Sequence, residues 1–435
     1  MSKVKSASTK IPTILIFGLG GYVHGSGTAA ALYFAKQGYH VIVTDQKSAD
    51  LLHQGTIKKL NKYPNVELVL GKHRKTDIRR ADLIVRNPGV SDQSPFMQYA
   101  HQLKKPITND VGIFLDELKE QFGPDGVTVV GITGTRGKST TTALIGHMLQ
   151  ARVGGNIGLS PLTFLNKIKA NDVVVLELSS WLLRDLHLPS LSVAVVTNML
   201  RDHMNYYKNM SLYQADKERI FLGQAPYHHA VVNATDSRVR QMAKKTKAQL
   251  HWFNKTSIKG VQLLGEHNQF NIGAAWQVGK VFGLTDKQLV AAVKSFKPLA
   301  NRLEVIRVHN GRTFINDTTA TTPDATIAAL LSFKKKVILI AGGNSKQLSL
   351  TALRKLIPQH VKKLILLPGN ANHDFPPGIT VSTMAQAVRT AWQLSKPGDI
   401  ILLSPGVTWL PLMNEFKRGE EFVKEVKKHL PNPPI

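Results

Sequence analysis

Short apolar runs alternate with segments of helical periodicity along the whole chain. In the helical segments, apolar residues return every three or four positions, whereas the runs between them are continuous and short. This alternation is typical of βαβ units, in which helices connect parallel strands. The pattern therefore predicts an α/β protein with mostly parallel sheets.

The expected strands form three groups, and a chain of 435 residues is long enough for about three domains. The strands are expected at 14–17, 41–45, 66–70, 82–85, 127–130, 173–177, 192–197, 230–233, 313–317, 336–341, 363–367 and 399–403. The principal helices are expected to begin at Thr28 and to span 112–121, 140–149, 323–332, 349–357, 384–395 and 415–429. We place a Rossmann-like domain at 1–107, a P-loop-type ATPase domain at 108–299 and a second Rossmann-like domain at 300–435.

Composition and charge narrow the class of protein. Hydrophobic residues make up 43% of the chain and charged residues 20%, as in ordinary globular proteins. The net charge of +27 comes from lysines and arginines scattered along the chain, so a solvated surface is favoured over attraction of polyanionic substrates, and both over nucleic-acid binding. The absence of cysteine excludes disulfides and thiolate metal sites. With no signal peptide and no apolar stretch of about 20 residues, we expect a cytoplasmic protein without membrane insertion.

A phosphate-binding loop is the strongest chemical signal. Residues 131–139 read GITGTRGKS and lie between the strand 127–130 and a helical segment. In such a turn, backbone N–H groups and the helix N-terminus bind phosphate, a lysine reaches the β/γ-phosphates and a hydroxyl binds Mg²⁺. Ile132 stands where the strict Walker pattern has its first glycine, so the loop is a variant. Its expected ATP-binding residues are Gly134, Thr135, Gly137, Lys138, Ser139 and Thr140.

The first segment has the outline of a nucleotide-binding Rossmann half. A glycine-rich turn over 18–27 follows the first strand, and Asp45 ends the second strand, where an acid meets a ribose or base. The glycine spacing departs from G-x-G-x-x-G at Val23, which disfavours a classical NAD site. The candidate substrate-binding residues here are Gly18, Gly20, Ser26 and Asp45.

Further polar residues follow strands of the second segment. Glu177 ends one strand and His203, preceded by Asp202, follows another, so both should approach the phosphate loop at the carboxyl edge of a parallel sheet. Glu177 near Ser139 suits a Mg²⁺ ligand, and its alternative role is a helix cap. An Asp-His pair is more often a turn, and Lys217, in a helical stretch, taken alone is a surface lysine.

Two other clusters have open interpretations. Asn268 and Asn271 are three residues apart and share a helix face, where their amides either bind a purine or cap the helix. Asp317 closes a strand of the third segment and either accepts from a ribose hydroxyl or holds a phosphate-binding lysine. Arg302 and Glu304 form either a clamp or a surface ion pair.

Taken together, these motifs resemble the Mur ligase superfamily, whose phosphate loop reads GxTGTxGK[ST]. The resemblance covers nearly the whole chain, and its motifs occur in family order. They are the phosphate loop, 154–158, 177–180, Asp202-His203, Lys217, 265–271, 302–304, 316–317, 341–343 with Lys346, and 402–405. The first domain and the sequence NDTTAT at 316–321 are most similar to members that add D-glutamate to UDP-N-acetylmuramoyl-L-alanine.

The resemblance implies a reaction and a set of roles. ATP would phosphorylate the alanine carboxylate, and the amine of D-glutamate would displace phosphate from the acyl phosphate. It implies a UDP-substrate-binding first domain, two Mg²⁺ ions, a small-molecule partner set without nucleic acid, and a monomer. It assigns the catalytic roles to Lys138, Glu177, His203 and Lys217, with Mg²⁺ held by Ser139, Glu177, His203 and a carbamylated Lys217. Asn268, Asn271, Arg302 and Asp317 match ATP-binding positions, and Asn156, Ser179, Lys346 and Thr408 match substrate-binding positions.

The chain departs from the family pattern at four places: Arg136 for asparagine, Leu182 for glutamine, Asn205 for aspartate and Thr319 for lysine. Arg136 adds a cation that seeks phosphate, whereas Leu182 and Thr319 bear on amino-acid specificity. The alternatives are a related ligase with another acceptor or amino acid, and a basic protein that binds nucleotides or nucleic acid without catalysis. The intact phosphate lysine and metal ligands favour an active enzyme.

Overall fold

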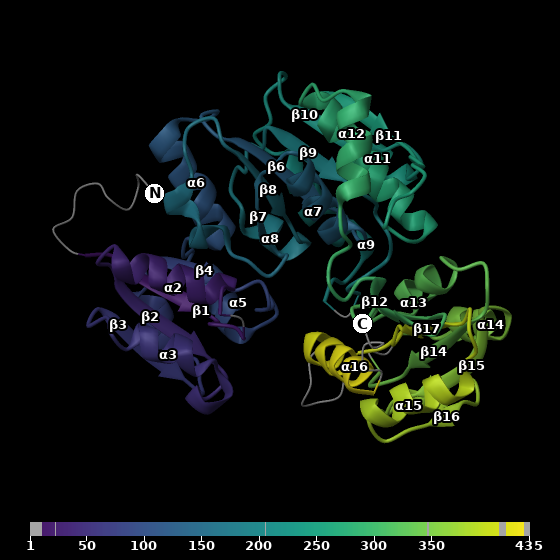
Figure 1. Ribbon diagram of the computed structural model, residues 1–435. Coiled ribbons are helices and arrows are strands. Elements are labelled where there is room, and N and C mark those ends of the chain that lie inside the picture. The colour runs from purple at the N-terminus through teal and green to yellow at the C-terminus, as the bar shows by residue number, and fades with distance from the viewer. Residues whose placement is uncertain (1–10, 22, 205, 346–347, 409–414, 430–435) are drawn as a thin grey trace. The chain divides into compact units, whose positions relative to one another are not determined.

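The computed structural model describes residues 11–21, 23–204, 206–345, 348–408 and 415–429 (Figure 1). The chain forms two compact units: Met1–Ser257 with Phe270–Val293, and Ile258–Gln269 with Lys294–Ile435. The first unit holds two sheets and the second holds one. No helix within the described ranges is long and apolar enough to span a bilayer.

The N-terminal sheet is entirely parallel, with the order β3-β2-β1-β4-β5. Its strands are β1 (Thr13–Phe17), β2 (His40–Asp45), β3 (Val66–Leu70), β4 (Leu83–Arg86) and β5 (Ile107–Thr108). Its helices are α2 (Ser26–Lys36), α3 (Gln54–Leu60), α4 (Lys75–Arg80) and α5 (Pro95–Gln102). Alternate residues of β1 enter opposite cores: Ile14 packs in the cluster that contains Phe34 of α2, and Leu15 in the one that contains Met97 of α5. Both faces of the sheet are therefore covered.

The central sheet is also parallel, with the order β11-β10-β9-β6-β8-β7. Its strands are β6 (Thr128–Thr133), β7 (Arg152–Gly155), β8 (Val173–Glu177), β9 (Val193–Val196), β10 (His229–Asn233) and β11 (Gln249–Phe253). The helices are α6 (Asp110–Phe122), α7 (Lys138–Met148), α8 (Ser180–Asp185), α9 (Met210–Glu218), α10 (Ser237–Ala243), α11 (Glu266–Val281) and α12 (Asp286–Ser295). Strand β6 lies between β8 and β9 and runs parallel to both, so the segments that follow these three strands all begin at the same edge of the sheet.

The sheet of the second unit has the order β12-β13-β17-β14-β15-β16, and only the β12–β13 pair is antiparallel. Its strands are β12 (Glu304–His309), β13 (Arg312–Asn316), β14 (Val337–Ala341), β15 (Val361–Leu366), β16 (Ile379–Thr380) and β17 (Ile400–Leu403). The helices are α13 (Pro323–Leu330), α14 (Thr351–His360), α15 (Met384–Leu394) and α16 (Glu415–His429). The predicted α/β class with mostly parallel sheets is confirmed.

Every strand expected from the sequence forms, but five further strands were not anticipated. The missed strands are β5, β7, β11, β12 and β16, and each lies at an edge of its sheet. An edge strand is covered less completely than a central one, so it lacks the continuous apolar run that marked the others. Helix α7 also begins at Lys138 rather than at the expected residue 140, which places Lys138 and Ser139 in its first turn.

A buried arginine ties the N-terminal sheet to the central segment. Arg86, at the end of β4, is 1% exposed, and its Nε donates to Asp185 of α8 at 2.8 Å. Its guanidinium also pairs with Asp92, which Arg184 contacts at 2.9 Å. Burial alone would lower the pKa of Arg86, but these two carboxylates raise it above its ordinary value. The guanidinium therefore stays charged inside the protein.

Replacing Arg86→Ala should leave buried Asp185 with only the more distant cation Arg184, whose Nε lies 3.7 Å from Asp185 Oδ1. Loss of one partner of a buried ion pair costs about 3–5 kcal/mol of unfolding free energy. The control Arg80→Ala removes an exposed pair with Glu67 and should cost less than about 1 kcal/mol. Urea unfolding followed by circular dichroism measures both. Equal shifts in the two variants would contradict the assigned role of Arg86.

Candidate active site

The phosphate loop connects β6 to α7 and is braced by the segment that follows β9. Gly137 caps α7 with a left-handed φ of 82°. The Thr135 hydroxyl donates to the Leu200 carbonyl at 3.1 Å and accepts from the Leu200 amide at 3.0 Å. Lys138 folds back over the loop, where its Nζ donates to the Thr135 carbonyl at 3.0 Å. The loop is thus held in shape by the protein's own contacts.

Two glycines of this loop are required by close neighbours. A Cβ on Gly134 would lie 1.9 Å from the Thr197 hydroxyl, and one on Gly137 would lie 2.2 Å from the Asn271 amide oxygen. The same amide oxygen accepts from the Thr141 hydroxyl at 3.3 Å. The structure therefore brings the predicted residue Asn271 against the phosphate loop.

Arg136 is anchored at both its backbone and its side chain. Its amide donates to Asn198 Oδ1 at 2.8 Å, and Asn198 Nδ2 donates to the Arg136 carbonyl at 3.0 Å. The guanidinium pairs with Asp202 at 2.6 Å. Burial opposes ionisation of Asp202, but Arg136 and His203 hold the pKa of its carboxyl below its ordinary value. The unexpected cation in the loop is therefore matched by a carboxylate of the same site.

Glu177 presents a carboxylate oxygen that the protein leaves unused. The residue is 1% exposed, and its Oε1 accepts from Asn156 Nδ2 at 3.0 Å. Its buried Oε2 has no hydrogen-bond partner among the described residues. A buried carboxylate oxygen with free lone pairs fits a hard cation such as Mg²⁺.

Lys217 is a buried amine at the base of the loop. It is 1% exposed, and its Nζ donates to the Gly134 carbonyl at 2.8 Å and lies 4.8 Å from the centre of the Tyr213 ring. Burial and the nearby Lys138 ammonium lower the pKa of Lys217 well below its ordinary value. The expectation of a surface lysine, drawn from this residue alone, is wrong. A lowered pKa makes the neutral, nucleophilic form of this amine easier to reach than that of an exposed lysine.

His203 lies close to the same group of residues. Its ring centre is 4.8 Å from Trp181 and 5.9 Å from Tyr213, and its φ of 56° is left-handed. Burial lowers the pKa of His203 to about 4, and neighbouring Asp202 opposes this shift. The imidazole is therefore neutral at pH 7 and able to donate a lone pair to a metal. Within the described ranges, no three His, Asp or Glu side chains are placed to hold a metal by themselves.

The other candidate metal-binding and substrate-binding residues at this edge of the central sheet lie at the starts of helices or beside Glu177. Ser139 and Thr140 are the second and third residues of α7, with Ser139 next to Lys138. Ser179 caps α8, because its hydroxyl accepts from the Leu182 amide at 3.2 Å. Asn156 also donates its backbone amide to the Glu177 carbonyl, at 2.9 Å. Asn156 is thus doubly bound to the strand that carries Glu177.

In the N-terminal sheet, Asp45 braces the glycine turn. Its Oδ2 accepts from the amides of Leu19 at 2.8 Å and Gly20 at 3.2 Å. A Cβ on Gly27 would lie 2.3 Å from the Gly18 carbonyl, so this glycine allows α2 to pack against the turn. Asp45 was expected to contact a ribose or base; in this structure its carboxylate holds the glycine-rich turn in place.

Two further polar residues, Ser26 and Asn87, lie in or against the glycine-rich turn. The Ser26 hydroxyl donates to buried Asp110 at the start of α6, so it faces α6 in this structure. Asn87, just after β4, lies against the turn, with its amide nitrogen 2.8 Å from the Cβ position of Gly20. The sequence motifs assigned neither Asn87 nor Asn198 to a site. The available signal was the same in both cases, a polar residue directly after a buried strand.

The second unit holds the other predicted residues. Asp317 is buried, and its carboxylate accepts from the Ser404 hydroxyl at 2.9 Å and the Leu303 amide at 3.2 Å, next to Arg302. Thr319 donates to the Asn301 carbonyl at 2.9 Å, and Asn268 donates to the Leu264 carbonyl at 2.6 Å. Thr408 bridges to Asn344 by backbone hydrogen bonds. Lys346 and Asn205 lie outside the described residues.

The comparisons with known proteins agree on one class of enzyme. Residues 12–109 match the Mur ligase MurD-like N-terminal domain, 132–260 the Mur ligase middle domain, and 301–407 the Mur ligase glutamate ligase domain. The fold is similar to that of UDP-N-acetylmuramate–alanine ligase from Thermotoga maritima, with a TM-score of 0.60 and 17% identity over 97% of this chain and 100% of that one. The chain belongs to the Mur ligase family.

Among curated relatives, the chain is similar over nearly its full length to enzymes that share one name. The chain is 34% identical to the UDP-N-acetylmuramoylalanine–D-glutamate ligase of Roseiflexus sp., over 95% of this chain and 98% of that protein. It is 32% identical to the enzyme of the same name from Koribacter versatilis, over 95% and 97%. The family resemblance inferred from the motifs is confirmed.

The ionisation of Asp317 should affect stability between about pH 4 and pH 7. Burial raises the pKa of Asp317 from 3.8 to about 7, so the folded protein holds this proton over a range in which the unfolded chain has released it. Stability contributed by this group is therefore present at low pH and is lost as pH rises towards 7. Asp317→Asn should remove this loss. Thermal unfolding at pH 4 to 7 measures it, and parallel pH profiles in variant and wild type would contradict it.

Proposed function

We propose that the protein is an ATP-dependent ligase that joins D-glutamate to UDP-N-acetylmuramoyl-L-alanine in peptidoglycan precursor synthesis. The observation that carries the proposal is the near full-length similarity to curated D-glutamate ligases. The braced phosphate loop with Lys138, Glu177, His203 and Lys217 around it supplies the matching chemistry. We propose that it acts as a monomer in the cytoplasm, and its lack of cysteine suits a reducing compartment.

The reaction begins with phosphoryl transfer. The terminal phosphoryl group of ATP moves to the alanine carboxylate, which forms an acyl phosphate and ADP. Negative charge builds on the phosphoryl oxygens, and catalysis depends on placing fixed positive charge around them. The amides of the loop, the N-terminus of α7 and the Lys138 ammonium provide that charge.

Amide formation completes the reaction. The free amine of D-glutamate attacks the carbonyl carbon of the acyl phosphate, the new C–N bond forms, and phosphate leaves with the electrons of the C–O bond. The nitrogen loses one proton as the amide forms. Water would hydrolyse the acyl phosphate, so the site must be enclosed during this step.

Ser139, Glu177, His203 and carbamylated Lys217 are the residues that would hold two Mg²⁺ ions. The unused Oε2 of buried Glu177 and the neutral imidazole of His203 support this fit. When bound, Mg²⁺ neutralises charge on the phosphate oxygens. Lys217 would become a ligand after its neutral amine attacks CO₂, which forms an N–C bond and releases one proton, leaving a carbamate.

The remaining assignments concern binding. We assign ATP contacts to the loop residues Gly134, Thr135, Gly137 and Thr140, and to Asn268, Asn271, Arg302 and Asp317. We assign substrate contacts to Gly18, Gly20, Ser26, Asp45, Asn156, Ser179, Lys346 and Thr408. The position of Asn271 against Gly137 and of Asn156 against Glu177 supports these sets.

The purified protein should release phosphate from ATP when UDP-N-acetylmuramoyl-L-alanine and D-glutamate are both present. Lys138→Ala should lower this rate at least about 100-fold, because it removes one fixed charge from the transition state, while unfolding is unchanged. Coupled ADP release and mass detection of the amide product measure both. Faster turnover with another amino acid or acceptor would favour the alternative ligase, and turnover by Lys138→Ala at the wild-type rate would contradict the assigned loop.

Carbamylation of Lys217 has a direct test. Wild-type protein equilibrated with ¹³C-bicarbonate should show a carbamate carbon signal by NMR, and removal of CO₂ should lower the ligation rate reversibly. Lys217→Arg keeps a cation but provides no amine to react, so it should lack the signal and the activity. A wild-type spectrum without a carbamate signal, with ligation unaffected by CO₂, would exclude this ligand.

A further inference from the structure

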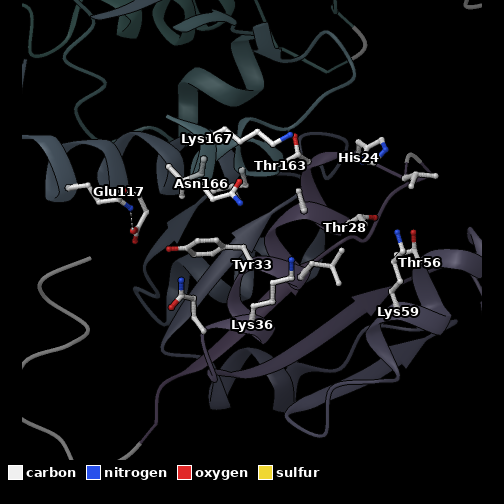
Figure 2. Close-up of a pocket in the computed structure, with 17 residues that line it drawn as sticks. His24, Thr28, Tyr33, Lys36, Thr56, Lys59, Glu117, Thr163, Asn166 and Lys167 are labelled. Atoms are coloured by element: carbon white, nitrogen blue, oxygen red, sulfur yellow. Dashed lines mark hydrogen bonds between the residues drawn. The ribbon is translucent and has the colours of Figure 1, made fainter. Parts of the chain in front are cut away.

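A second pocket lies in the first unit and shares no residue with the predicted catalytic and substrate sites. Its volume is about 590 Å³, in the range of small-molecule sites. Helices α2 and α3 line one side (Figure 2). Helix α6 and the 3₁₀ turns η2 (Pro161–Thr163) and η3 (Leu165–Lys167) line the other. The pocket therefore lies between the N-terminal sheet's helices and the central segment.

The pocket combines an apolar floor with a basic rim. Ala29, Leu162 and Leu165 are buried and form part of the floor. The rim carries exposed lysines from three separate elements, Lys36 of α2, Lys59 of α3 and Lys167 of η3. Figure 2 shows Lys36 and Lys167 on opposite sides of the pocket, with Tyr33 on the side of Lys36.

These three ammonium groups have no carboxylate partner among the described residues. The single acid of the lining, Glu117, accepts from two other lining residues, the Tyr33 hydroxyl and Gln121 Nε2, the latter at 3.3 Å. Three lysines among the described residues do form surface ion pairs, namely Lys245, Lys280 and Lys362, the last with Asp399 at 2.6 Å. The lining thus carries three lysines against one carboxylate, above an apolar surface.

We propose that this pocket binds a small organic phosphate, with the phosphate among Lys36, Lys59 and Lys167 and an apolar body on the leucine floor. A phosphate dianion suits a rim with lysines from three elements, because each long lysine side chain can reach phosphate as a flexible point charge. An apolar body gains free energy by covering the floor, which inorganic phosphate would leave exposed. The inference does not depend on the ligase activity.

Calorimetric titration with 1-naphthyl phosphate tests both parts of the site on the full-length protein. Wild type should bind it at least about tenfold more tightly than either 1-naphthol or inorganic phosphate. The double variant Lys36→Gln/Lys167→Gln should bind at least about tenfold more weakly than wild type. The matched control Lys58→Gln/Lys169→Gln loses the same charge from exposed neighbours outside the lining, and should stay within about twofold of wild type.

Lys138→Ala separates this pocket from the phosphate loop. If 1-naphthyl phosphate binds at the proposed pocket, its affinity is the same in Lys138→Ala as in wild type. Loss of binding in Lys138→Ala would place the ligand on the loop and overturn the proposal. Equal affinities of the two double variants would also overturn it, as would a wild type that binds none of the compound.

Discussion

The close approach of backbones at the phosphate loop is the constraint on which the rest of the site depends. Three neighbouring central strands end at one edge, and the loop after β6 is pressed between the segments that follow them. Gly134 has Thr197 against it and Gly137 has Asn271, at distances that leave no space for a side chain. A substitution at either glycine would push the loop away from the residues that brace it. Phosphate binding by backbone amides needs this exact packing, because amide dipoles act only over short distances.

The charges around the loop are unbalanced in a way that suits phosphate chemistry. Arg136 is paired with Asp202. Lys138 and Lys217 lie in the same region, and burial together with the Lys138 ammonium lowers the pKa of Lys217. One buried oxygen of Glu177 has no hydrogen-bond partner in the part of the chain that the structure describes. Each of these groups is costly in isolation, since buried polar atoms and charges are normally paired. Together they suit the phosphate groups and the Mg²⁺ ions that we propose for this site.

The large positive charge of the chain has more than one role. Arg86 is wholly buried and connects β4 to α8 through Asp185, which makes it part of the core. Lys36, Lys59 and Lys167 line one pocket and form no ion pair with the carboxylates that the structure describes, whereas Lys362 forms a surface pair with Asp399. Composition alone favoured a solvated surface for all of them. The difference comes from which elements bring the side chains together.

Local signals in the chain were sufficient for the central strands, for the phosphate loop and for the polar residues Glu177 and His203, because buried strands and glycine turns have strong patterns over a few residues. The edge strands β5, β7, β11, β12 and β16 escaped, since half-covered strands need no continuous apolar run. Other contacts join residues far apart in the sequence. Arg136 pairs with Asp202, 66 positions away, and Arg86 with Asp185, 99 positions away. The buried Lys217 likewise donates to the carbonyl of Gly134, 83 positions away. Folding alone determines these contacts, because burial and charge pairing depend on distances in space that sequence spacing does not encode.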